Sequence, residues 1–65
     1  DRVLLSPGAA ETLALRTDRA WVQVVSGTVT VDGTALRAGD GAAITDTRSL
    51  ELSSDAEAEA LVFDL

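Results

Sequence analysis

Short runs of alternating apolar and polar residues, separated by turn residues, extend through the whole 65-residue chain. Alternation with a period of two is typical of strands that turn one face toward a core. The predicted strands cover residues 2–5, 11–16, 20–25, 28–31, 34–37, 42–45, 49–53 and 58–65. About eight short strands at this regular spacing predict an all-β sandwich or barrel. We expect a single domain over residues 1–65, because a chain of this length has room for only one core.

The turn residues carry two further predictions. Asp32-Gly33 is the strongest hairpin signal in the chain, and it predicts a two-residue type I′ turn with positive φ at both positions. Residues 55–60 leave an alternative open, because their Ala and Glu residues favour a short helix that Ser54 could cap. A strand or turn is favoured there, since the following Leu-Val-Phe run at 61–63 is typical of a buried strand.

The alternation also assigns faces to the apolar side chains. Leu13 and Leu15 share one face of their predicted strand, and Leu50 and Leu52 share one face of another. The opposite face carries Thr12, Ala14 and Arg16 in the first strand and Ser49, Glu51 and Ser53 in the second. This contrast points the four leucines toward the interior.

Two aromatic residues are candidates for a protein interface. If Ala20 points inward, then Trp21, Gln23 and Val25 point outward along the same strand. Tryptophan is enriched at the centres of interfaces, so this stripe predicts a contact with a partner, unless another segment of the chain covers it. Phe63 lies on a terminal strand that is apolar on both faces, which indicates a strand that is either central in its sheet or covered by a partner.

Composition limits the chemistry. The chain has no histidine, cysteine, lysine or tyrosine, and its eleven acidic residues outnumber five arginines to give a net charge of −6. The missing donors favour a non-catalytic domain. The negative charge argues against nucleic acid and against an anionic membrane as partners. No spanning run or leader is present, and the absence of cysteine fits a cytoplasmic protein.

The acidic residues have plain structural interpretations. Asp40 stands between two glycines, where an aspartate typically bonds its own backbone within a turn. Glu57 and Glu59 would lie about 7 Å apart on one strand face. Such a spacing resembles the carboxylate pair of an inverting glycosidase, but an acidic strand edge that prevents aggregation is the favoured interpretation.

The ordered segments VVSG (24–27), VTVDG (29–33) and LRAGDG (36–41) resemble the core of the cupin family. Together with residues 19–25 and 61–65, they are similar to the C-terminal half of pirin-like bicupin proteins, a group that includes bacterial quercetin dioxygenase-like enzymes. The resemblance covers residues 9–65 and implies a small jelly-roll-like cupin β-sandwich or barrel. Because the chain begins with Asp1, we expect it to be a C-terminal fragment of a bicupin.

Active cupins hold a metal with three histidines and a glutamate at fixed distances from the two motif glycines. Counted from Gly27 and Gly39, the resemblance places those ligands on Leu13, Leu15, Ala20 and Leu50, all of which are apolar. These side chains offer no lone pair to a metal. We therefore expect no catalytic residue, no metal site and no cofactor in this chain.

A register shifted by one residue would place Ala14 and Arg16 at the first two ligand positions, and neither would bind a metal there. The leading hypothesis is a metal-free structural domain that packs against a second cupin domain or forms a homodimer. One alternative is a part of a metal-dependent quercetin 2,3-dioxygenase-like enzyme whose catalytic centre lies outside this chain. Another is a small-ligand or protein-binding module.

Overall fold

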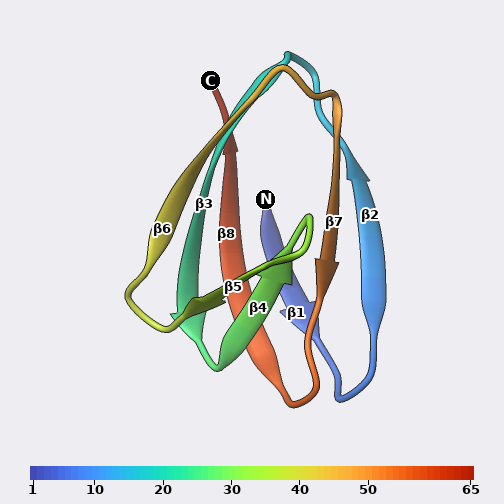
Figure 1. Cartoon of the computed structure of the whole chain (residues 1–65), viewed down its shortest axis with the longest axis vertical. Coiled ribbons are helices and arrows are strands. Elements are labelled where there is room, and N and C mark those ends of the chain that lie inside the picture. Colours follow the sequence, from blue (N-terminus) through green and yellow to red (C-terminus); the bar gives the residue numbers. More distant parts are fainter.

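The computed structural model describes all residues from 1 to 65 and consists of strands joined by turns (Figure 1). The eight strands are β1 (Arg2–Leu5), β2 (Ala10–Ala14), β3 (Arg19–Ser26), β4 (Thr28–Val31), β5 (Thr34–Arg37), β6 (Gly41–Thr45), β7 (Ser49–Ser53) and β8 (Ala58–Asp64). Each predicted strand is present, and most ends agree within one residue. The second strand ends at Ala14 rather than at the predicted residue 16. There the Thr17 hydroxyl begins a turn by donating to the Arg19 carbonyl oxygen.

The strands form two four-stranded antiparallel sheets with the orders β1-β8-β3-β6 and β2-β7-β4-β5. Successive strands mostly pass from one sheet to the other, so the two sheets face each other as the halves of a sandwich (Figure 1). This strand order is that of a jelly roll. The predicted all-β sandwich of eight short strands is confirmed, and no helix that could span a membrane is present.

The hairpin between β4 and β5 turns at the predicted dipeptide. Asp32 has a φ of 47° and Gly33 a φ of 89°, and Val31 pairs with Thr34 across the turn. Positive φ at both central residues is the signature of a type I′ turn, whose twist matches that of the flanking strands. The Asp32 carboxylate also accepts a hydrogen bond from the backbone N–H of Glu51 at 2.9 Å, which ties the hairpin to β7.

The end of β3 approaches the start of β8 at Gly27. The register of the β3–β8 pair shifts between Val24 and Ser26, and Gly27 then adopts a φ of 74°. A Cβ atom at Gly27 would lie 2.5 Å from the Glu57 carbonyl oxygen. Only glycine satisfies both the backbone conformation and the close approach.

Strand β8 lies between β1 and β3, so it is central in its sheet, while Phe63 on its outer face stays 49% exposed. It begins at Ala58, and the preceding residues 55–57 form no helix. The hydroxyl of Ser54 donates to the Thr28 carbonyl oxygen at 2.7 Å and accepts from the N–H of Ala56 at 3.3 Å. Ser54 therefore fixes the start of the connection from β7 to β8 against β4, rather than capping a helix.

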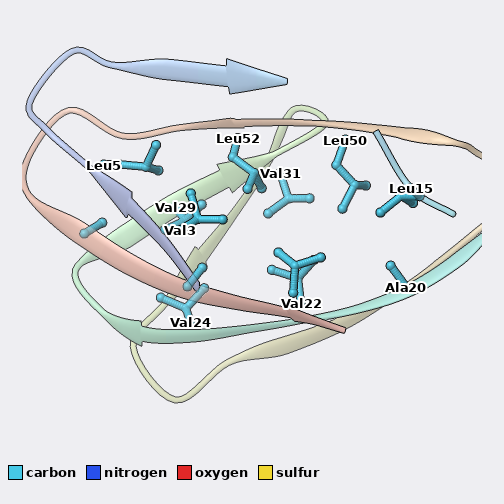
Figure 2. Packing of buried hydrophobic residues seen from close by; sticks show 13 residues of the cluster. Val3, Leu5, Leu15, Ala20, Val22, Val24, Val29, Val31, Leu50 and Leu52 are labelled. Atoms are coloured by element: carbon cyan, nitrogen blue, oxygen red, sulfur yellow. The ribbon is translucent and has the colours of Figure 1, made fainter. Parts of the chain in front are cut away.

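The core fills the space between the two sheets (Figure 2). It consists of thirteen apolar residues: Val3, Leu5, Leu15, Ala20, Val22, Val24, Val29, Val31, Leu50, Leu52, Ala58, Ala60 and Val62. Both sheets contribute, as the alternation of apolar residues predicts. Leu50 and Leu52 are the largest of the fully buried side chains.

Candidate functional site

The four positions where the cupin resemblance places metal ligands lie in the interior of the sandwich. Leu15, Ala20 and Leu50 are buried in the core cluster, and half-buried Leu13 packs against it. Leu13 on β2 is directly opposite Leu50 on β7 in the strand register. Leu15 and Leu50 gather at one end of the core, where Ala20 faces them from the opposite sheet (Figure 2).

This cluster offers only carbon atoms to a ligand. A metal of the kind cupins hold requires imidazole nitrogens or carboxylate oxygens, and none of the four side chains carries either. The interior contains no buried side-chain nitrogen or oxygen that lacks a hydrogen-bond partner. No three acidic side chains lie close enough together to hold a metal ion. The residues at these positions therefore do not fit the metal that the cupin resemblance implies.

Two hollows occur on the molecule, with volumes of about 420 and 410 Å³, and neither is lined by any of those four positions. The first lies over the ends of β4 and β7 and is lined mainly by hydroxyl and backbone groups, including Thr28, Thr30 and Ser53. The second lies beside β1 and the start of β8. The second hollow is bordered by the core residues Leu5 and Ala58, and no further hollow occurs on the molecule.

The residues predicted to face outward on β3 do so. Trp21 is 38% exposed and Val25 is 47% exposed, while Ala20, Val22 and Val24 between and beside them are buried. Gln23 is half-buried. Its amide oxygen accepts a hydrogen bond from the Trp21 indole N–H at 3.2 Å, and its amide nitrogen donates to the Asp40 carbonyl oxygen at 3.1 Å.

Phe63 is 49% exposed and pairs directly with Trp21 across the β3–β8 ladder. The two aromatic residues, which are 42 positions apart in the chain, therefore lie side by side on the outer face of one sheet. Three other apolar residues of this face, Leu4, Ala43 and Leu61, were not singled out from the sequence. Ala43 pairs with Trp21, and Leu61 pairs with Gln23, so both lie beside the aromatic pair, whereas Leu4 pairs with Glu59 farther along β8. Such pairings depend on a register that no local pattern specifies.

The acidic residues have structural roles or face solvent. The Asp40 carboxylate accepts a hydrogen bond from the Arg37 backbone N–H at 2.9 Å, and the Asp40 N–H donates to the Arg37 carbonyl oxygen at 2.9 Å. This confirms the turn interpretation. Glu59 forms an ion pair with Arg2, with 2.5 Å between Oε2 and Nε. Glu57 precedes β8, so the two glutamates do not share a strand as the spacing suggested.

Comparison with known proteins identifies the family. The model of the quercetinase C-terminal cupin domain matches residues 2–65. Quercetin 2,3-dioxygenase from Escherichia coli strain K12 is 43% identical over 47 residues, which are 72% of this chain and 20% of that protein. The same identity and coverage apply to quercetin 2,3-dioxygenase from Escherichia coli O157:H7.

Solved structures agree. The crystal structure of YhhW from Escherichia coli superposes with a TM-score of 0.91 at 34% identity, over 98% of this chain and 28% of that one. Bacterial pirin YhhW in complex with nickel(II) gives the same values. The chain thus spans less than a third of the length of these relatives. The strand order, the filled core and these matches together show that the chain belongs to the family of quercetinase C-terminal cupin domains and has a pirin-like cupin fold.

Proposed function

We propose that this chain is a metal-free structural domain of a pirin-like protein and that it packs against a second cupin domain. One observation carries the proposal: leucine and alanine occupy all four positions where the cupin resemblance places metal ligands, and these side chains belong to the core or pack against it. A domain that had kept a metal site would need donor atoms at that place. The relatives are several times longer than this chain, which supports the proposal that it is the C-terminal unit of a longer bicupin.

The energetics of a small domain support this role. Each buried leucine contributes about 1.5–3 kcal/mol relative to an exposed one. A domain of 65 residues has little stability beyond what such burial supplies. Replacing a polar metal pocket with Leu15 and Leu50 therefore stabilises the fold at the cost of the first coordination shell. Packing against a second domain would add to that stability.

One alternative keeps a specific argument. The relatives from Escherichia coli are named quercetin 2,3-dioxygenase, and one solved relative is described in complex with nickel(II). This chain could thus belong to a metal-dependent dioxygenase whose catalytic centre lies outside residues 1–65. Both hypotheses assign no metal to this domain, and both fit the cytoplasmic location that the absence of cysteine suggests.

Metal analysis of the purified chain tests the proposal. The chain is incubated in turn with Fe(II), Ni(II), Cu(II) and Mn(II), passed through a desalting column and measured by inductively coupled plasma mass spectrometry. Escherichia coli pirin YhhW, which has been described with nickel(II), is treated in parallel as the loading control. We expect YhhW to retain nickel and the chain to retain none above the blank. One equivalent of any metal retained by the chain would contradict the proposal.

A turnover assay separates the dioxygenase alternative. With a flavonol as substrate and the same four metals added, the 65-residue chain is expected to consume no substrate above the buffer rate. If the longer protein that contains the chain consumes it, the catalytic centre lies in the remaining part. Metal-dependent turnover by the chain itself would contradict both hypotheses.

A further inference from the structure

The first of the two hollows, on the sheet β2-β7-β4-β5, has a polar lining. We call it the hydroxyl hollow and define it by the residues that line it: Gly27, Thr28, Thr30, Ser53, Ser54, Asp55 and Ala56. Among these residues only Ala56 has an apolar side chain. Its volume of about 420 Å³ falls within the range of about 300–1,000 Å³ that is typical of small-molecule sites. The hydroxyl hollow therefore has room for a small ligand.

The short ladder between β4 and β7 explains why a hollow occurs there. The two strands pair at only two positions, Thr30 with Ser53 and Val31 with Leu52. The same register, continued by two residues, would place Thr28 opposite residue 55. Strand β7 ends at Ser53, however, and the chain turns there toward β8. The start of β4 and the turn after β7 thus form the two sides of the hollow.

Three side-chain hydroxyls share this outer face. Thr28 and Thr30 alternate with buried Val29 along β4, and Thr30 pairs with Ser53 across the ladder. The side-chain hydroxyls that form hydrogen bonds within the chain are those of Thr17, Thr47 and Ser54. The hydroxyls of Thr28, Thr30 and Ser53 form none, so all three keep their donor and acceptor positions for a ligand.

Hydrogen bonds at Ser54 hold the floor of the hollow in place. Its buried hydroxyl donates to the Thr28 carbonyl oxygen at 2.7 Å and accepts from the Ala56 N–H at 3.3 Å. Its carbonyl oxygen accepts from the Gly8 N–H at 2.9 Å, and its own N–H donates to the Ala9 carbonyl oxygen at 3.3 Å. Groups that are fixed before binding lose little conformational entropy when a ligand arrives.

From this arrangement we infer that the hydroxyl hollow binds a small, neutral, aliphatic polyol, such as a monosaccharide. A hydroxyl group both donates and accepts hydrogen bonds, so the hydroxyls of a polyol match those of Thr28, Thr30 and Ser53. The carboxylate of Asp55, which also lines the hollow, only accepts. Its two oxygens suit two adjacent hydroxyls of one ligand.

The lining disfavours other classes of ligand. An anion would meet the Asp55 carboxylate in a chain whose net charge is −6. A divalent metal ion prefers several carboxylates, and no cluster of three acidic side chains occurs in the structure. An aromatic ligand would need an apolar surface, which Ala56 alone does not supply.

Nuclear magnetic resonance of the isotope-labelled 65-residue chain tests the site. The chain is titrated with methyl α-D-glucopyranoside, methyl α-D-galactopyranoside and meso-erythritol in turn. With at least one of them we expect saturable shifts at the amides of the hydroxyl hollow. The expected dissociation constant is on the order of 1 mM, because only a few hydrogen bonds form. Isopropanol, which has a single hydroxyl, is the control ligand and should give no saturable shift.

Four outcomes would overturn the inference. One is the absence of a saturable shift with all three polyols, and a second is a set of shifts confined to residues outside the hollow. Saturable binding of isopropanol would show that adjacent hydroxyls are not what the site recognises. Tighter binding of catechol, an aromatic diol, would contradict the aliphatic class of ligand. None of these outcomes affects the metal analysis, because the lining residues lie outside the core cluster.

Substitutions locate the binding contacts. Thr30→Val removes a hydroxyl while keeping the shape of the side chain, and we expect the affinity for the polyol to fall about three- to tenfold. Thr12→Val is the matched control, since exposed Thr12 lies on β2 of the same sheet but does not line the hollow; its affinity should not change.

Asp55→Asn keeps the size of the side chain and removes the charge, which should lower the affinity about tenfold, because a hydrogen bond to an ionised acceptor is stronger than one to a neutral group. Ser53→Ala serves as a further variant if Thr30→Val fails to fold, as judged by far-UV circular dichroism. Unchanged affinity in the folded hydroxyl variant and in Asp55→Asn would contradict the inference.

Discussion

Leu50→Ala tests whether a position where the resemblance places a metal ligand is part of a close-packed core. Leu50 has no exposed surface and lies opposite Leu13, within the cluster that fills the sandwich. Truncation of a leucine in such a place removes its transfer free energy and leaves a cavity, which together cost about 2–5 kcal/mol. At about 0.05–0.15 kcal/mol per residue, the chain as a whole has roughly 3–10 kcal/mol of stability. The substitution should therefore remove a large part of it.

The assay is equilibrium unfolding of the 65-residue chain in urea, followed by far-UV circular dichroism, together with a thermal melt. We expect a melting temperature lower by more than about 10 °C, because each kcal/mol shifts a domain of this size by about 4–8 °C. Leu4→Ala is the matched control, since Leu4 is 61% exposed on the outer face. Its free energy of unfolding should change by no more than about 0.5 kcal/mol.

The comparison between the two leucines can refute the reasoning. A residue that lines an open ligand cavity already has empty space beside it, so its truncation creates little new void. If Leu50→Ala and Leu4→Ala cost the same to within about 0.5 kcal/mol, the interior at Leu50 is not filled. The proposal of a metal-free packing unit would then lose its main support.

Three further outcomes follow from single contacts. Gly27→Ala should lower the free energy of unfolding by about 2 kcal/mol or more in urea titrations. Gly8→Ala should lower it by only about 1 kcal/mol, because both glycines have positive φ but only Gly27 has close neighbours. Equal losses in the two variants would contradict this. Ser54→Ala should cost about 0.5–1.5 kcal/mol in the same titrations, because the part-buried hydrogen bond from Ser54 to the Thr28 carbonyl is lost. A neutral effect would contradict this expectation. Trp21, the only tryptophan, should stay open to acrylamide quenching in the isolated chain at every concentration; quenching that falls as concentration rises would reveal self-association.

Much of the fold could be predicted because the signals are local. The alternation of apolar residues depends only on the period of a strand, and it placed Leu50 and Leu52 in the core correctly. The Asp32-Gly33 turn was predictable for the same reason, since its geometry is set by two adjacent residues. The strand character of the terminal segment was favoured over a helix, and β8 is a central strand.

The site was predictable only in part. The outward stripe on β3 follows from alternation, but its meeting with Phe63 requires the β3–β8 register, which joins distant parts of the chain. The close approach of the Trp21 ring to Gly41 also escaped the sequence, because it joins two residues that are twenty positions apart in the chain. The predicted strand began at residue 42, so Gly41 was assigned to the turn around Asp40 and gave no separate signal.

The most direct test of the central claim is an anomalous scattering experiment on crystals of this chain grown with excess Ni(II). Data collected at the nickel absorption edge locate every bound nickel ion without reference to the assumed chemistry. We predict continuous density for the leucine side chains at 13, 15 and 50, with no anomalous peak among them. An anomalous peak inside the sandwich beside Ala20 would contradict the account.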